Sequence, residues 1–475
     1  MDEFSNHLKV EDEYGNRYTL SGKSWEGGQG KVTIDSTGKF AIKQLVSMQK
    51  EKPVDRERIR QQINKVKIMP FDNLPVAKPL ALLKAPALGY VMEFLTGMVP
   101  IHSLICPPPE IAKEDTNQLL DWYIKTGGLR RRLQILARLA TVINRLHSKG
   151  LVYGDLSSNN VFISFSLDHT EVYLIDLDNL CYESSAGDSF IGTPFFQAPE
   201  VYNRQRGINT LTDAFSFSVL AFETLALGHP FMGDIVIYGN PDIYEKEAQS
   251  GKLPWVFHNT DNTNSSSQVL PKDLMFSEGL FKLLRTTFED GLLDCRKRPG
   301  LSQWEKSLYA AARFTLICPS CGWSYYYHHN NCSKCEAPQP DYLLAIVDDY
   351  AINPDHSLEL LHGKVTGYCM QVPGKFSITR RLLGFNGESS DIPFMEIEVD
   401  ADFKMSICCL DEKKEIWITH EDWKYEREID NGKPKIRVKT SGVQTNRLKQ
   451  IHVGELNKTH SVIRFQKKQA RNETS

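Results

Sequence analysis

One polar segment of the chain constrains the fold more than any other feature. It spans Tyr153–Asn160 and reads Tyr-Gly-Asp-Leu-Ser-Ser-Asn-Asn. An expected amphipathic helix precedes it and ends at Gly150. The apolar face of that helix is formed by Leu133, Leu136, Ala140, Ile143 and Leu146. A short apolar run further along the chain ends on Asp176, so the Asp176 carboxylate and the Asn160 amide are expected to reach one magnesium ion. Taken singly, Asp155 also reads as a helix cap and Asp176 as a turn residue.

A glycine-rich turn lies between two expected strands within residues 16–45. The turn contains Gly27, Gly28 and Gly30. Glycines let the backbone approach a phosphate closely, although a plain hairpin turn uses the same residues. Lys43 then lies inside an otherwise apolar strand that includes Ala41. A lysine in such a strand needs an anionic partner, phosphate or carboxylate, unless it lies at an edge and faces water.

These parts match what phosphoryl transfer requires from a protein. Lys43 and the glycine turn would hold a triphosphate, and Asn160 and Asp176 would hold magnesium. Asp155 would accept or orient the proton of the acceptor hydroxyl. Because all of these parts occur in chain order, we interpret them as one phosphotransfer site.

Three further motifs follow. The segment Gly192–Glu200 reads Gly-Thr-Pro-Phe-Phe-Gln-Ala-Pro-Glu, Asp213 lies in Thr-Asp-Ala-Phe-Ser-Phe-Ser, and Arg298 lies in Lys-Arg-Pro. With the segments above, they make residues 16–312 resemble the protein kinase family. The resemblance implies that Asp213 braces the catalytic loop and that Arg298 pairs with Glu200.

The resemblance also implies an α+β, two-lobed kinase-like fold, with an N-lobe at residues 10–95 and a C-lobe at residues 96–312. It implies ATP and Mg2+ as cofactors, with Lys43, Asp155 and Asn160 as catalytic residues. Met92 is the implied gatekeeper, and Ala41 and Phe162 are implied to sandwich the adenine. The full set implied around the nucleotide is Gly27, Gly28, Gly30, Val32, Ala41, Lys43, Met92, Glu93, Leu95 and Phe162.

The catalytic loop departs from the family pattern in two ways. Gly154 stands where the family has an arginine that pairs with a phosphorylated activation segment. We therefore expect an activity that does not require phosphorylation of Ser184, Ser185 or Ser189. Ser157 replaces a lysine that contacts the transferring phosphate, so part of the charge stabilisation comes from elsewhere or is missing.

Other departures lie on the nucleotide side of the site. Trp25 replaces the first glycine of the family loop. Asp178 replaces the glycine of Asp-Phe-Gly, which restricts how far that turn can flip. Two positions are open for the helix residue that is expected to pair with Lys43. Glu57 is the nearest acid and is favoured, whereas the family spacing points to Gln62.

Four of the ten cysteines form two Cys-x-x-Cys pairs that are ten residues apart. The four are Cys318, Cys321, Cys332 and Cys335. Four thiolates satisfy tetrahedral Zn2+ with no open position, so residues 313–337 are predicted to form a small structural zinc ribbon. Redox-active pairs are the alternative. His328 and His329 are expected at the surface rather than as ligands.

Residues 338–475 are predicted to form a β-rich C-terminal domain. Alternating apolar runs at residues 394–399 and 415–419 predict strands, and Asn-Gly pairs at 386–387 and 431–432 predict turns.

The end of this domain is a basic tail. Residues 431–475 contain eleven lysines and arginines against two glutamates. The aromatic residues of the ribbon beside such a tail permit nucleic-acid contact, but a solvated tail is the favoured interpretation. The whole chain carries a net charge of -3, which implies no strongly polyanionic partner for the molecule.

The location of the protein is predicted from the signals that the sequence lacks. Its first residues do not show the basic-then-apolar layout of a signal peptide. The longest nearly apolar run, residues 214–227, is shorter than a membrane span. A cytoplasmic protein without membrane contact is expected.

The residue inventory favours a Ser/Thr protein kinase that transfers the γ-phosphate of ATP to protein hydroxyls. A nucleotide-binding pseudokinase is the main alternative, with the zinc ribbon and C-terminal domain acting as a scaffold. Aminoglycoside and choline kinases share the Gly-Asp pair, but they lack the Gly-Thr-Pro to Ala-Pro-Glu segment that builds a peptide platform. The Tyr-Gly-Asp-Leu-Ser and Leu-Ile-Asp-Leu-Asp-Asn segments are similar to bacterial Ser/Thr kinases encoded beside a von Willebrand-A-type protein and a PP2C-type phosphatase. This similarity implies those two proteins as partners.

Overall fold

The computed structural model describes residues 9–27, 30–45, 53–111, 115–187, 189–352, 358–385, 388–411, 413–419, 436–445, 450–455 and 458–468. The chain divides into two compact units. The first contains residues 1–127 and 131–308, and the second contains residues 128–130 and 309–475.

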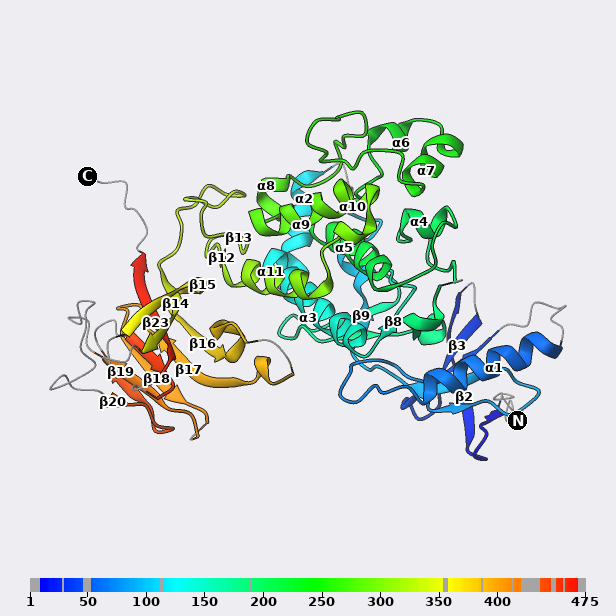
Figure 1. Ribbon diagram of the computed structural model, residues 1–475, viewed down its shortest axis with the longest axis horizontal. Helices are drawn as coiled ribbons and strands as arrows, with labels where there is room; N and C mark the ends of the chain where they lie inside the picture. Colours follow the sequence, from blue (N-terminus) through cyan, green and yellow to red (C-terminus); the bar gives the residue numbers. More distant parts are fainter. Residues whose placement is uncertain are drawn as a thin grey trace, which may run out of the picture. The chain divides into compact units, whose positions relative to one another are not determined.

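The first unit begins with an antiparallel six-stranded sheet in the order β1-β2-β3-β4-β6-β5. Figure 1 labels β2 and β3 of this sheet, next to helix α1. Its strands are β1 (Lys9–Glu11), β2 (Arg17–Gly27), β3 (Gly30–Asp35), β4 (Phe40–Gln44), β5 (Ala81–Leu82) and β6 (Gly89–Glu93). Successive side chains of a strand point to opposite faces. Ala41 and Met92 accordingly lie in one apolar cluster, and Ile42 and Val91 lie in another. Helix α1 (Pro53–Lys67) packs through its isoleucines against the first cluster.

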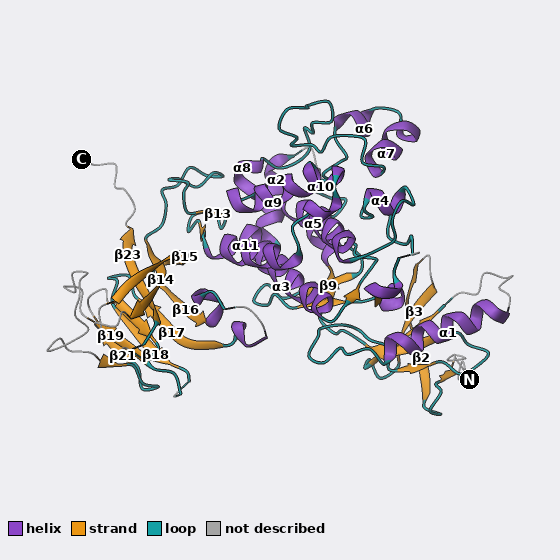
Figure 2. Ribbon diagram, in the orientation of Figure 1, coloured by secondary structure: helices purple, strands orange, loops and turns teal. Residues whose placement is uncertain are grey.

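The rest of the first unit is mainly helical (Figure 2). Its helices are α2 (Thr116–Lys125), α3 (Gly128–Ser148), α4 (Pro199–Tyr202), α5 (Thr210–Ala226), α6 (Asp234–Tyr238), α7 (Pro241–Gln249), α8 (Lys272–Met275), α9 (Glu278–Phe288), α10 (Asp290–Leu293) and α11 (Leu301–Arg313), of which α3 and α11 run across the division between the units. Helix α5 is buried along nearly all of its length, since most of its residues are apolar or small and its buried polar side chains have hydrogen-bond partners. Among the helices that the structure describes, none is long and apolar enough to span a membrane.

The polar segments of the first unit lie on, or next to, short strands and 3-10 turns. The strands are β7 (Met98–Pro100), β8 (Leu151–Val152), β9 (Val161–Ser164), β10 (Val172–Leu174) and β11 (Cys181–Tyr182). Strands β9 and β10 pair antiparallel, so the segments that end at Asn160 and begin at Asp176 lie beside each other. The turn Leu177–Asn179 follows directly.

The second unit opens with the hairpin β12 (Thr315–Ile317) and β13 (Ser324–Tyr326), next to the four cysteines. A six-stranded sheet follows in the order β15-β14-β23-β22-β19-β20, and a four-stranded sheet in the order β16-β17-β18-β21. The strands are β14 (Tyr342–Ile352), β15 (Leu358–Gln371), β16 (Gly374–Thr379), β17 (Pro393–Val399), β18 (Met405–Cys409), β19 (Ile416–Thr419), β20 (Ile436–Arg437), β21 (Val443–Thr445), β22 (Gln450–Val453) and β23 (His460–Lys468).

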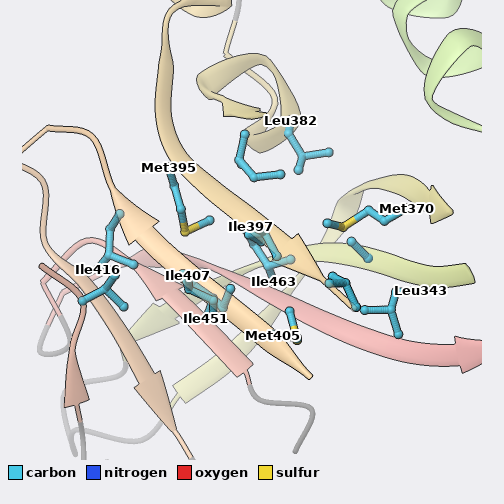
Figure 3. Close-up of a cluster of buried hydrophobic side chains, with 14 of the residues drawn as sticks. Leu343, Met370, Leu382, Met395, Ile397, Met405, Ile407, Ile416, Ile451 and Ile463 are labelled. Atoms are coloured by element: carbon cyan, nitrogen blue, oxygen red, sulfur yellow. The ribbon is translucent and has the colours of Figure 1, made fainter. Parts of the chain in front are cut away.

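One apolar core joins the two larger sheets of the second unit (Figure 3). Ile397 and Ile407 contribute from the four-stranded sheet, and Ile451 and Ile463 contribute from the six-stranded sheet. The predicted β-rich C-terminal region is therefore confirmed. Strands β17 and β19 lie at the two predicted apolar runs, whereas the expected turns at 386–387 and 431–432 lie outside the described residues.

Candidate functional site

Strand β4 places Lys43 in the interior of the first unit, with 5% of its surface exposed. Its Nζ donates hydrogen bonds to Asp176 Oδ1 at 2.7 Å and to Asp178 Oδ2 at 2.6 Å. Burial opposes the charged amine, but the carboxylates of Asp178 and Asp176 outweigh it and raise the pKa of Lys43. The ammonium group is therefore held between two carboxylates.

Asp176 occupies a left-handed backbone conformation, with φ 55°, and Ile175 separates it from the end of β10. Burial raises the pKa of its carboxyl, as do the charges of Asp178 and Asp155, while Lys43 acts to lower it. A divalent cation would relieve this repulsion between carboxylates, because its positive charge favours their ionised forms. The residues therefore fit the predicted magnesium site.

The loop that carries Asp155 is braced from helix α5. Asp213 accepts hydrogen bonds from the backbone N–H groups of Tyr153 at 2.8 Å and Gly154 at 2.9 Å. It also contacts His147 Nε2 at 2.9 Å. A buried carboxylate with three partners fixes the backbone of the loop, as expected for Asp213.

Both carboxylate oxygens of Asp155 have polar partners. Thr193 Oγ1 donates to Oδ1 at 2.7 Å, and Asn179 Nδ2 donates to Oδ2 at 3.3 Å. Asn160 Nδ2 donates to the Asp155 carbonyl at 2.9 Å, which leaves the amide oxygen of Asn160 for another ligand. The side chain of Asp155 is thus fixed in orientation from two directions.

The glycine turn closes the β2–β3 hairpin, with Gly27 paired to Gly30. Gly30 has φ 155°, and a Cβ there would lie 2.4 Å from the Gln44 carbonyl oxygen. A side chain at this position would therefore collide with strand β4. Gly28 lies outside the described residues.

Four of the residues expected around the nucleotide base share one apolar cluster. They are Val32, Ala41, Met92 and Leu95. Ile175, which precedes Asp176, packs against the same cluster. Glu93 is exposed at the end of β6, and Phe162 lies on β9 opposite Tyr173, outside this cluster.

The expectation that Glu57 pairs with Lys43 is wrong. Glu57 is exposed and accepts a hydrogen bond from Gln61, four residues along α1. Gln62 points inward instead, and its Nε2 donates to the carbonyls of Asp178 at 3.2 Å and Leu180 at 3.1 Å. The rotation of α1 about its axis determines which side chain faces the site, and that rotation cannot be read from the spacing of acids.

The predicted pair of Arg298 and Glu200 is present. Two guanidinium nitrogens of Arg298 contact the Glu200 carboxylate at 2.6 and 2.8 Å. Thr193, the partner of Asp155, precedes Glu200 in the same segment. The bidentate pair therefore ties this segment to the helical part of the first unit.

The four cysteines of the second unit converge. Their Sγ atoms all lie within 4.8 Å of one another. Burial opposes ionisation of Cys318, but backbone N–H groups of Cys321 and Ser320 outweigh it and lower the pKa of Cys318 to about 7. Four thiolate donors at this separation fit one tetrahedral zinc ion, and no cysteine pair in the described residues forms a disulfide.

Together, the lysine, the paired acids and the braced aspartate form the set of groups that phosphoryl transfer requires from a protein. Comparison with known proteins agrees, since residues 27–310 match the protein kinase domain family. The match covers more than half of the chain, and the protein belongs to the protein kinase family. The expected succession of kinase domain, four-cysteine cluster and β-rich region is thereby confirmed.

Individual relatives are similar to shorter stretches of this chain. A probable serine/threonine-protein kinase WNK8 of Oryza sativa is 31% identical over 113 residues, 24% of this chain and 17% of that protein. Ribosomal protein S6 kinase alpha-3 of Mus musculus is 38% identical over 102 residues, 21% of this chain and 13% of that protein. Protein kinase kin1 of Schizosaccharomyces pombe is 30% identical over 121 residues, 25% of this chain and 13% of that protein. The chain thus spans less than a fifth of the length of these relatives.

Sequence reasoning missed several residues of the site. The sequence marks Asp178 only as a missing glycine, and it assigns no role to Ile175, Asn179 or Thr193. Their positions next to Asp176 and within the Gly-Thr-Pro motif are the sequence signals that could have found them.

Proposed function

We propose that the chain is an ATP-dependent Ser/Thr protein kinase that transfers the γ-phosphate of ATP to protein hydroxyls. The observation that carries this proposal is the two-sided fixing of Asp155 by Thr193 and Asn179. A carboxylate held in this way accepts the proton of a substrate hydroxyl in a defined direction.

The other residues have complementary roles in this proposal. Asn160 and Asp176 hold magnesium, which neutralises phosphate charge when bound. Lys43 contacts the phosphates, and the glycine turn at Gly30 brings backbone N–H groups close to them. The adenine packs against the cluster that contains Ala41, with Met92 as gatekeeper and Phe162 on its other side. Glu93 to Leu95 form the hinge.

We further propose that phosphorylation of the activation segment is not required. The segment is already anchored by bonds that need no phosphate. Gln197 Nε2 donates to the Ile191 carbonyl at 3.1 Å, and His229 Nε2 lies 2.9 Å from the Phe195 carbonyl. Gly154 offers no guanidinium group to a phosphate. A variant with alanine at Ser184, Ser185 and Ser189 should therefore keep its activity within about twofold of wild type, since the first two serines are exposed and Ser189 is only partly buried. Near-complete loss in a folded variant would contradict the proposal.

We also propose that the four cysteines hold Zn2+ in a structural ribbon at residues 313–337, between kinase lobes at 10–95 and 96–312 and a C-terminal domain at 338–475. The similarity of the loop segments to bacterial Ser/Thr kinases supports a von Willebrand-A-type protein and a PP2C-type phosphatase as partners. Co-purification of these two proteins with the tagged chain would test that assignment.

The enzymatic proposal is tested by incubating the purified protein with labelled ATP, Mg2+ and a general protein substrate, beside an Asp155→Ala variant. We expect label on serine or threonine residues from wild type and a loss of at least about 100-fold in the variant. Equal signal from both proteins, with intact nucleotide binding, would instead identify a pseudokinase. Label found on an aminoglycoside or choline, and not on protein, would identify a small-molecule kinase.

A further inference from the structure

The ion pairs of Lys43 show an arrangement that the family pattern does not anticipate. A buried ammonium group needs a nearby negative charge, because removing it from water is costly. Both carboxylates that serve Lys43 lie in the turn after β10, at Asp176 and Asp178. Among the described side chains of α1, Glu57 is the one carboxylate, and it is exposed.

The two carboxylates are not equivalent once the nucleotide is bound, and this step rests on the proposed function. Asp176 then ligates magnesium and shares its charge with the metal. Asp178 is then the carboxylate left to Lys43 alone.

The surroundings of Asp178 hold it in place. Its backbone carbonyl accepts a hydrogen bond from the side-chain amide of Gln62 on α1. Its carboxylate accepts a hydrogen bond from Lys43. Tyr90 lies across from Lys43 on β6, and its ring is 5.8 Å from the amine. The side chain of Asp178 is only 18% exposed, which strengthens a charge pair relative to one in water.

We propose that Asp178 is the positioning residue of Lys43, taking the part that a carboxylate on α1 would otherwise play. Asp178 holds the amine in line for the phosphates, and Gln62 couples α1 to the same turn through neutral hydrogen bonds. The orientation of Lys43 therefore depends on the turn at Asp178 and not on an ion pair with the described carboxylate of α1, Glu57.

The first test compares Asp178→Asn, which removes the charge at constant size, with Asp178→Glu, which restores it. Asp168→Asn is the matched control, because Asp168 is exposed and lies outside the site. In the phosphotransfer assay we expect D178N to lower kcat/KM for ATP by about 10- to 100-fold, D178E to recover part of it, and D168N to match wild type. If D178N does not fold, Asp178→Ser takes its place.

The second readout does not need phosphotransfer. The affinity for a non-hydrolysable ATP analogue at saturating Mg2+, measured by isothermal titration calorimetry, reports how well Lys43 meets the phosphates. D178N should weaken that affinity by about tenfold and D178E should restore part of it, even if wild type proves to be a pseudokinase. Unchanged affinity in folded D178N would overturn the proposal. So would a loss of affinity that a higher Mg2+ concentration fully reverses, because it would assign Asp178 to the metal instead.

Discussion

Gly154 explains in steric terms why the catalytic loop lacks the family arginine. Its backbone has φ 80°, and a Cβ at this position would lie 2.6 Å from Ile208 Cδ1. An L side chain is disfavoured at such a φ, and here it would also meet a packed neighbour. The loop conformation and the absence of the arginine are thus one feature of the molecule.

Gly154→Ala should destabilise the first unit by about 1–3 kcal/mol, because backbone strain and the contact with Ile208 add together. Gly150→Ala is the matched control, since Gly150 has φ 71° but a Cβ at that position would meet nothing within 4 Å. Urea unfolding of the two variants measures the difference. A loss for G154A that is no larger than that for G150A would show that Ile208 moves aside without cost.

At the same scale, the sequence can assign candidate roles to residues that lie at fixed spacing on one loop or strand. Lys43, Asp155, Asn160 and Asp176 are all expected from their positions after strands or within the polar segment. The partner of Lys43 is not, because Asp178 reaches it across 135 residues of chain and Glu57 turns away. Which side chains meet across such a distance depends on tertiary packing, and a single sequence does not contain that information directly.

At the scale of elements, the bidentate pair between Glu200 and Arg298 joins α4 to the residue that follows the 3-10 turn Cys295–Lys297. The Arg298 side chain is 1% exposed and that of Glu200 is 12% exposed. Arg298→Met should therefore cost about 3–5 kcal/mol in urea unfolding, because it leaves a carboxylate buried without its partner. Arg296→Met, which removes an arginine that is 78% exposed, should cost at most about 1 kcal/mol. Equal losses for the two variants would contradict this prediction.

Strands β22 and β23 bring together two buried histidines. His452 Nδ1 lies 2.9 Å from His460 Nε2, and His460 Nδ1 lies 2.7 Å from the Lys458 carbonyl. Burial lowers the pKa of His460 below its ordinary 6.5, although the Lys458 carbonyl and the charge of Asp349 act to raise it. The unfolded chain therefore binds a proton more readily than the folded one.

The stability that His460 contributes should be complete above about pH 6.5 and should fall as the pH drops below that value, by up to about 1.4 kcal/mol per pH unit. Hydrogen exchange of β22 and β23 at pH 5 and pH 7.5 measures it. His460→Gln, which cannot take up a proton, should flatten the dependence. A wild-type exchange pattern that does not change between these pH values would contradict the assignment.

At the scale of the whole molecule, the order of regions along the chain was predictable, while the pairing of strands within the second unit was not. The local alternation of apolar and polar residues located β17 and β19. In contrast, β14 pairs with β23, which lies near the C-terminal end of the described residues. Such long-range pairing is selected by the shared apolar core rather than by local sequence. The four-cysteine cluster was predictable because its spacing encodes its chemistry.

The division into two units leads to a prediction about metal removal. The cysteines belong to the second unit, and Lys43, Asp155 and Asp176 belong to the first. Backbone hydrogen bonds within the ribbon join residues close in sequence. The Cys318 N–H donates to the Trp323 carbonyl at 2.8 Å, and the Cys332 N–H donates to the Ala337 carbonyl at 2.8 Å. Small zinc-binding segments of the kind we propose here unfold without their ion, because metal binding supplies much of their folding free energy.

Chelation of Zn2+, or the double variant Cys321→Ser and Cys332→Ser, should therefore raise hydrogen exchange across residues 315–338 by at least about tenfold. The affinity for an ATP analogue should stay within about threefold of wild type, since no nucleotide residue lies in the ribbon. Cys295→Ser, a cysteine outside the cluster, is the matched control and should retain one zinc per chain. Unchanged exchange in metal-free protein would show that the ribbon is held by its apolar contacts. Loss of nucleotide binding on chelation would show that the metal supports the kinase domain as well.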